Sequence, residues 1–214
     1  MIIVGTEILT SFINIVAESL LTPVVILLVI FLIIAILSIG GLINEKFTRK
    51  ALNHNDLEIL LNDINDAGSV DELKSVIDSS NLLSNQKEII SSIVNNYKLD
   101  AEARKSYASK LVEDEQLVLV KKTNINDILV RVGPVLGLLG TLIPLGPGLS
   151  ALGSGQIDTL AQALTIAFDT TVIGLTISSL SYVVSKYKKQ WYESDLTTVE
   201  TIAEATLEKI SNLS

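Results

Sequence analysis

The sequence predicts an all-α integral membrane protein, with three transmembrane helices and a helical cytoplasmic extension. Its 214 residues are 48% hydrophobic and 19% charged, and the mean hydropathy of +0.48 is too apolar for an ordinary soluble domain. Residues 19–44 and 132–157 contain no charged side chain, and residues 159–185 contain only Asp169. Each of these runs is long enough to cross a bilayer, which takes about 20 helical residues. Three spans are therefore the simplest interpretation.

The basic residues predict how the chain is oriented. All sixteen Lys and Arg lie either between Lys46 and Arg131 or from Lys186 onward, so they fall on one side of a three-span protein. Loops rich in Lys and Arg face the cytoplasm. We therefore expect the N-terminus outside, the C-terminus in the cytoplasm, and a short external loop at residues 153–158.

Three segments are expected in the first half of the chain. Residues 1–21 carry polar side chains at helical spacing, which predicts an amphipathic helix on the outer membrane surface; an irregular extension of the first span is the alternative. Residues 22–44 form the first transmembrane helix. Residues 45–126 form a cytoplasmic helical region, in which Ser69 and Glu72 fit a capping box.

Three further segments follow. Residues 127–152 form the second transmembrane helix, which Pro144 and Pro147 should kink or unwind. Residues 158–186 form the third, and residues 187–214 a cytoplasmic C-terminal helix whose apolar stripe should pack on the cytoplasmic helices or on a neighbouring subunit. Unwound backbone at membrane depth is tolerated only against protein or water. A proline break would therefore indicate an assembled, partly wet interior.

Small residues follow the second and third spans at helical spacing. Gly133, Gly137 and Thr141 recur every four residues, a pattern that lets another helix approach closely. The third span has a longer set, with steps of three and four residues and mostly hydroxyl-bearing side chains. Its members are Ala167, Thr171, Gly174, Ser178, Ser181 and Ser185. Such a face packs against a helix or lines a narrow path in which hydroxyl groups hold water, and both can hold in one assembly.

Asp169 lies on a different face of the third span. That face also carries Gln162, Thr165 and Thr176. An acid at membrane depth is costly unless something uses it, and a carboxyl group there suits proton exchange. Alternatively, Asp169 lies near the outer boundary and is hydrogen-bonded to Thr165 or to the proline-interrupted part of the second span.

The composition argues against an enzyme and against a nucleic-acid partner. The chain has no cysteine, one histidine in the polar segment NHND, no phosphate-binding glycine loop and no paired intramembrane acids. We therefore expect no catalytic residues, no cofactor and no metal site. The formal net charge of −8 disfavours nucleic acid.

Two motifs resemble those of the MotA/TolQ/ExbB proton channel family. GPVLGLLGT at residues 133–141 is similar to the family's small residue and proline leading to GLxGT, and LAQALTIAFDTTVIGL at residues 160–175 is similar to its third-helix pattern, which ends in threonine followed by xxGL. Three spans with an external N-terminus resemble the ExbB/TolQ branch, since MotA proteins have four. The chain departs from the pattern at Ile166, where branch members often have glutamate, and at residues 144–148.

The resemblance implies a homopentamer around a dimer of an ExbD/TolR-like single-span protein, whose intramembrane aspartate takes up and releases protons. It implies a multi-pass protein in the lipid bilayer of a prokaryotic cytoplasmic (inner) membrane. It matches the family's pore threonines to Thr141 and Thr171. The expected ion-pathway residues are Thr141, Asp169, Thr171 and Ser178, and the expected helix-packing residues are Gly133, Gly137 and Gly174.

The sequence thus predicts the channel-forming subunit of a motor complex that is driven by the proton-motive force and transduces energy through movement of its partner. Two alternatives stay open. A membrane scaffold would use the small-residue faces only to pack helices, and a self-sufficient ion channel would conduct through Asp169 without a partner.

Overall fold

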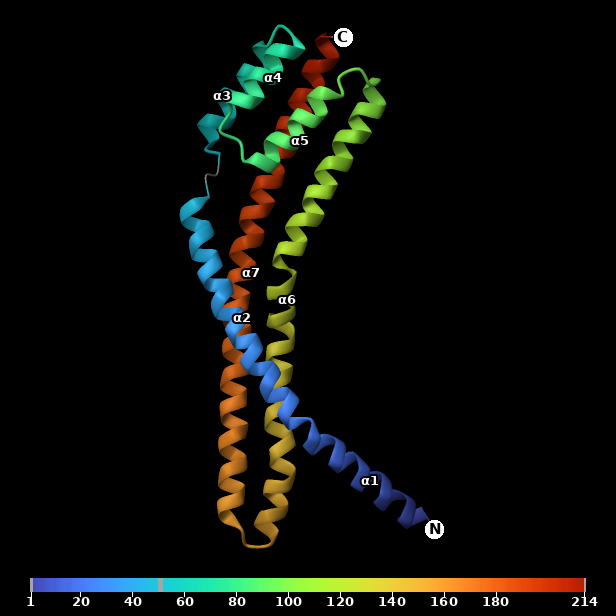
Figure 1. Cartoon of the computed structure of the whole chain (residues 1–214), viewed down its shortest axis with the longest axis vertical. Helices are drawn as coiled ribbons and strands as arrows, with labels where there is room; N and C mark the ends of the chain where they lie inside the picture. Colours follow the sequence, from blue (N-terminus) through green and yellow to red (C-terminus); the bar gives the residue numbers. More distant parts are fainter. Residues whose placement is uncertain (1, 50–51, 214) are drawn as a thin grey trace. The chain divides into compact units, whose positions relative to one another are not determined.

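The computed structural model describes residues 2–49 and 52–213, with side chains from Glu7 onward, and every regular element in these ranges is an α-helix (Figure 1). The elements are α1 (Ile2–Ser19), α2 (Leu21–Thr48), α3 (His54–Asp66), α4 (Val70–Ser79), α5 (Ser84–Asn95), α6 (Ala101–Gly153) and α7 (Ile157–Leu213). Three helical segments of the described chain are long and apolar enough to cross a bilayer: Glu7–Thr48, Ala101–Gly153 and Ile157–Leu213. The predicted all-α class with three candidate spans is confirmed.

The chain divides into two compact units. The apolar unit comprises Met1–Asn44 and Asn124–Lys186, and the polar unit comprises Glu45–Thr123 and Tyr187–Ser214. The apolar unit contains the three uncharged runs, so it holds the candidate site.

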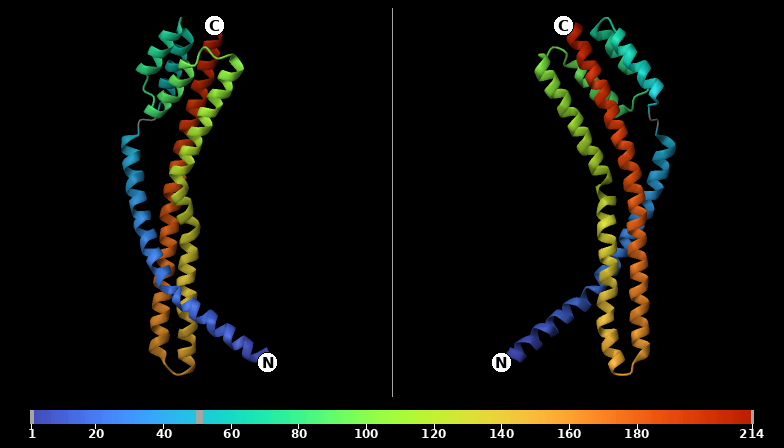
Figure 2. Two further views of the ribbon diagram at one scale, coloured as in Figure 1. Left: turned by 45° about the vertical axis from the view of Figure 1, so that its right-hand side comes forward. Right: turned by 180° about the vertical axis from the view of Figure 1, so that it is seen from behind.

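In the apolar unit, α2 packs on an antiparallel pair made by α6 and α7 (Figure 2). Their shared core contains Val24, Leu28 and Ala35 of α2, Leu129 and Leu136 of α6, and Ile177 of α7. The turn between α6 and α7 is short, and it requires the positive φ of 77° at Gly155, which an L side chain rarely adopts.

Helix α1 is set off from α2 at Leu20 and carries a largely uncovered apolar surface. Ile8, Leu9, Phe12 and Ile13 are each more than 60% exposed. Figure 2 shows α1 leading away from the other helices of the apolar unit. Its apolar residues are thus available to a bilayer or to another chain.

The polar unit has its own core. Ile64 of α3, Leu73 of α4 and Ile90 of α5 are fully buried, together with Ile202 and Ile210 of α7.

The cap that the sequence placed at α4 differs in one detail. The Ser69 side chain accepts a hydrogen bond from the Glu72 amide at 3.2 Å, as an N-cap should. The Glu72 carboxylate accepts from the Gly68 amide at 2.8 Å, one residue before the position that a capping box uses.

Helix α6 does not unwind at its prolines. It stays helical through Pro134, Pro144 and Pro147 as far as Gly153, so of the two expected alternatives, a kinked helix or unwound backbone, the second is wrong. A proline removes the amide that would bond the carbonyl four residues earlier. Such a carbonyl is tolerated when a neighbouring helix supplies another donor.

Candidate functional site

The candidate site lies along the α6–α7 seam, the contact between residues 126–148 of α6 and residues 163–185 of α7. Gly133 and Gly137 of α6 touch Gly174 of α7 with almost no space between the backbones: a Cβ added at Gly174 would lie 2.6 Å from the Gly133 carbonyl oxygen and 2.9 Å from the Gly137 Cα. The three residues expected to pack helices therefore meet at one contact. Small-xxx-small spacing permits this close approach.

The seam continues toward the end of α6 through two glycines that were not singled out from the sequence. A Cβ at Gly140 would lie 2.5 Å from the Thr170 Cβ, and a Cβ at Gly148 would lie 2.8 Å from the Ala163 Cβ. Thr170 is only 5% exposed, and its hydroxyl group donates to carbonyls of its own helix. Thr170, and not Thr171, thus fills the space that Gly140 leaves.

Thr141 and Thr171 lie at one level of the seam, because they follow directly after Gly140 and Thr170, which touch. Both are half-buried. The Thr141 hydroxyl donates to the Leu138 carbonyl at 2.6 Å, and the Thr171 hydroxyl donates to the Ala167 carbonyl at 3.0 Å. Each oxygen keeps lone pairs with which it can accept a hydrogen bond from water.

Ser178 makes a direct bond across the seam. Its hydroxyl group donates to the Val130 carbonyl at 2.9 Å. Val130 lies four residues before Pro134, so this is the carbonyl that the proline deprives of its helical donor. Ser178 therefore satisfies a backbone group that would otherwise be unpaired in the helix interior.

Asp169 lies outside the seam, on an exposed face of α7. The other members of that face, Gln162, Thr165 and Thr176, are exposed as well. Thr165 is one of the hydrogen-bond partners that the sequence suggests for Asp169. Its hydroxyl group donates to the Ala161 carbonyl at 3.0 Å. A carboxylate at the bilayer centre costs about 2.5–3.5 kcal/mol on insertion scales. A face of this kind is therefore poorly suited to contact with lipid tails.

A charged cluster in the polar unit was missed from the sequence. Arg49, which directly follows α2, pairs with Asp195 of α7 and also donates to the Trp191 carbonyl at 2.8 Å. Lys188 pairs with Glu45 at 3.0 Å. These four side chains are 12–28% exposed, so the cluster is sheltered from solvent.

Burial changes the acid–base behaviour of two groups in this cluster. Burial raises the pKa of the Asp195 carboxyl group above its ordinary value, because the hydrogen bond and the charge of Arg49 do not fully offset it. Burial, followed by a hydrogen bond to Glu45, also raises the pKa of the Tyr192 phenol. Tyr192 is 8% exposed, with the Lys122 ammonium 5.7 Å from its ring centroid.

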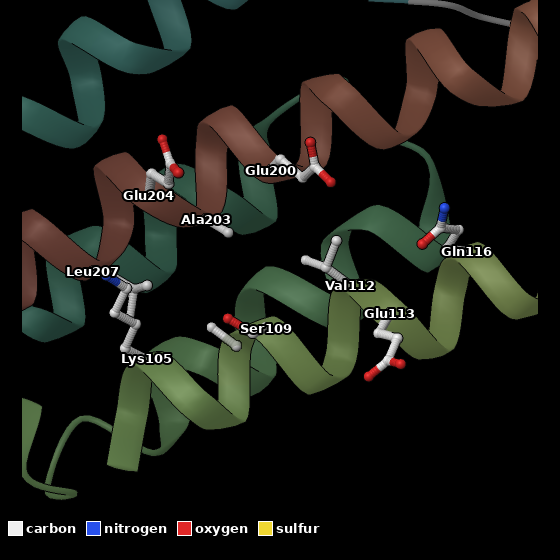
Figure 3. Close-up of a pocket in the computed structure, with 10 residues that line it drawn as sticks. Lys105, Ser109, Val112, Glu113, Gln116, Glu200, Ala203, Glu204 and Leu207 are labelled. Carbon is white, nitrogen blue, oxygen red and sulfur yellow. The ribbon is translucent and has the colours of Figure 1, made fainter. Parts of the chain in front are cut away.

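A groove of about 320 Å³ lies between α6 and α7 in the polar unit (Figure 3). The buried Ala108 and Ala203 lie at its base. Its edges carry the exposed carboxylates Glu113, Glu200 and Glu204. None of the site residues expected from the sequence lines it. Within residues 7–49 and 52–213, no three His, Cys, Asp or Glu side chains gather in a way that could hold a metal ion.

Comparison with known proteins agrees with the geometry of the seam. No curated protein matches the chain. The sequence model of one family, described as the MotA/TolQ/ExbB proton channel family, matches residues 43–201, which is well over half of the chain and includes the whole seam. The chain belongs to the MotA/TolQ/ExbB proton channel family.

Proposed function

We propose that the chain is the channel-forming subunit of a motor complex that uses the proton-motive force. We further propose that the chain belongs to the ExbB/TolQ-like branch of the family. Membership of the proton channel family and three helices able to span a bilayer support this proposal. The observation that carries it is the exposed face of α7 around Asp169, which runs beside the level of Thr141 and Thr171.

An exposed carboxylate at membrane depth needs a polar environment. If several copies surround a common axis and this face turns inward, the carboxylate meets water or protein, and the insertion penalty falls. A homopentamer around an ExbD/TolR-like single-span partner would provide such an interior. The hydroxyl oxygens of Thr141 and Thr171 would accept hydrogen bonds from water beside the partner's aspartate.

The proposed cycle follows from this arrangement. A proton enters from outside, neutralises the partner's aspartate and leaves on the cytoplasmic side. The change of charge alters how strongly the partner's side chain binds at the level of these threonines, so the partner moves relative to the ring. The placement of all sixteen Lys and Arg supports an external N-terminus and a cytoplasmic C-terminus, in the inner membrane of a prokaryote. The protein transports an ion and drives movement; we do not assign it an enzymatic reaction.

The test compares proton flux into liposomes that contain the complex, purified from native membranes through a tag on this chain. We expect Asp169→Asn and Thr171→Val each to lower the flux about tenfold, equivalent to about 1.4 kcal/mol on the transport barrier. Asp158→Asn, at the start of α7, is the matched acid control. Native mass spectrometry should find all variants in the same assembly. Full flux in both site variants would refute the ion-path assignment.

Two other functions each have one observation in their favour. The backbone contact of Gly174 with Gly133 and Gly137 would also suit a scaffold. In that case Asp169→Asn would be silent, and a bulky residue at Gly174 would prevent assembly. The exposure of Asp169 would also suit a channel without a partner, which predicts proton flux from the purified chain alone.

A further inference from the structure

Two polar side chains are buried in the seam. Asn126 of α6 is 2% exposed and Ser181 of α7 is 0% exposed. Within the described residues, neither the Asn126 Oδ1 nor the Ser181 Oγ makes a hydrogen bond. A buried polar atom left unpaired costs about 1–3 kcal/mol, and nearly all such atoms in folded proteins bond to protein or to ordered water.

Both groups lie beside two hydrogen bonds that cross the seam. Ser178 donates to the Val130 carbonyl at 2.9 Å, and Ser185 donates to the Asp127 carboxylate at 2.6 Å. On α7, Ser181 lies between these two serines, one turn from each. On α6, Asn126 precedes Asp127 directly. This end of the seam is therefore polar.

The other end of this polar stretch is closed by apolar side chains. Leu129 and Ile177, one turn from Asn126 and Ser181 respectively, are both completely buried. The polar stretch is thus a local feature, bounded by a packed core and by the Ser185 to Asp127 bond.

We propose that ordered water binds in the seam at Asn126 and Ser181, and that this water passes protons toward Asp127. A buried water makes two to four hydrogen bonds. Asn126 Oδ1 accepts one hydrogen from the water, whereas Ser181 Oγ both accepts and donates. Ser185 has its hydrogen committed to Asp127, so its oxygen accepts from the water side.

In this relay, each proton that arrives on the water releases another along the chain of hydrogen bonds to the Asp127 carboxylate. No other reactant is consumed. The direction of travel rests on the proposed channel function, whereas the water site does not. The seam would then provide a proton exit within each chain, in addition to any path between chains.

The first test is a structure of the assembled complex at a resolution that shows ordered water. We expect density within about 2.7–3.2 Å of the Ser181 Oγ and the Asn126 Oδ1. A dry seam, with both side chains turned to bond backbone groups, would overturn the water site.

The second test uses Ser181→Ala and Asn126→Leu, which remove the two polar groups; leucine keeps the branched shape of the asparagine side chain. Exposed neighbours provide the matched controls Ser179→Ala and Asn124→Leu. We expect the first pair to lower proton flux about tenfold, equivalent to about 1.4 kcal/mol, and the control pair to leave it unchanged. Thermal unfolding separates a relay from a packing defect: if the seam is dry, Ser181→Ala stabilises the protein and keeps full flux.

The two proposals fail in different ways. Flux that is lost in Asp169→Asn but kept in both Ser181→Ala and Asn126→Leu overturns the relay and leaves the channel assignment standing. A wild-type complex that passes no protons overturns the channel and with it the relay, while the density for water still decides whether the site exists.

Discussion

Replacing Gly174 by alanine should separate α6 from α7. The added Cβ would lie 2.6 Å from the Gly133 carbonyl oxygen and 2.9 Å from the Gly137 Cα, and ordinary contact begins at 3.4 Å. Both neighbours are backbone atoms, which cannot rotate out of the way. The helices would have to move apart by about 0.8 Å at this level, a gap that forfeits a quarter to a half of each van der Waals contact there.

The expected loss is about 2 kcal/mol of unfolding free energy. Inserting a methyl group into a well-packed interior costs about 1–3 kcal/mol, and a clash with two backbone segments lies toward the upper end. Alanine recovers up to about 1 kcal/mol through its better helix propensity, which lowers the net effect. The clash outweighs this gain, so the net effect is destabilising.

Thermal unfolding of the full chain in detergent measures this difference, with Gly146→Ala as the control. Nothing lies within 4 Å of a Cβ added at Gly146, so alanine there should leave stability unchanged or raise it by up to about 1 kcal/mol. If Gly174→Ala unfolds at the same temperature as Gly146→Ala, the seam is looser than the structure describes and the packing argument is wrong.

Two further predictions concern hydrogen bonds between distant residues. Ser178→Ala should cost about 1–3 kcal/mol, because it leaves a proline-freed carbonyl of α6 unpaired, whereas the exposed Ser179→Ala should cost little; calorimetry compares the two. Arg49→Gln should shift the titration of Asp195 to higher pH, because it removes the hydrogen bond and the charge that hold this pKa down. A carboxyl group whose pKa is raised in the folded state makes stability fall as pH rises through that pKa. In Arg49→Gln this fall in stability should therefore extend to higher pH. Unfolding measured at a series of pH values would detect the change. The exposed Lys110→Gln should not change either curve, and an identical shift in both variants would contradict the assigned pairing.

Much of the fold follows from the distribution of charge along the sequence. An uncharged run of more than 20 residues has to satisfy its backbone internally at membrane depth, and a helix does so within one segment. In the second span, Gly133 and Gly137 are four residues apart and therefore lie on one face of the helix. This spacing was enough to indicate a packing face before any partner helix was known.

Which face of α7 packs against α6 was less predictable. A set with steps of three and four residues fits two neighbouring faces of a helix about equally well. Thr171 belongs to one of these faces and Thr170 to the other, and only the contact with Gly140 distinguishes them. The glycine-rich motif in α6 contained the signal, since Gly140 follows Gly137 by three residues.

Contacts between distant parts of the chain could not be predicted from local patterns. The carbonyl that Pro134 frees is bonded by Ser178, which supplies a donor from another helix. The pairing of Arg49 with Asp195 joins residues 146 positions apart. Neither residue stands out by spacing, and charged residues next to a span are ordinary interfacial anchors.

The glycine contact has a consequence for how the protein can move. Sliding α6 along α7 by one residue would bring a side chain onto the backbone where Gly174 now faces Gly133 and Gly137. Because that arrangement has no nearby alternative, residues 126–148 and 163–185 are expected to behave as one rigid body during transport. Any motion that a passing ion produces must then take place at the outer surfaces of this pair, such as the exposed face of α7, and not between its two helices. Under the proposed function, the moving contact would accordingly lie where this helix pair meets a partner, and not within the pair.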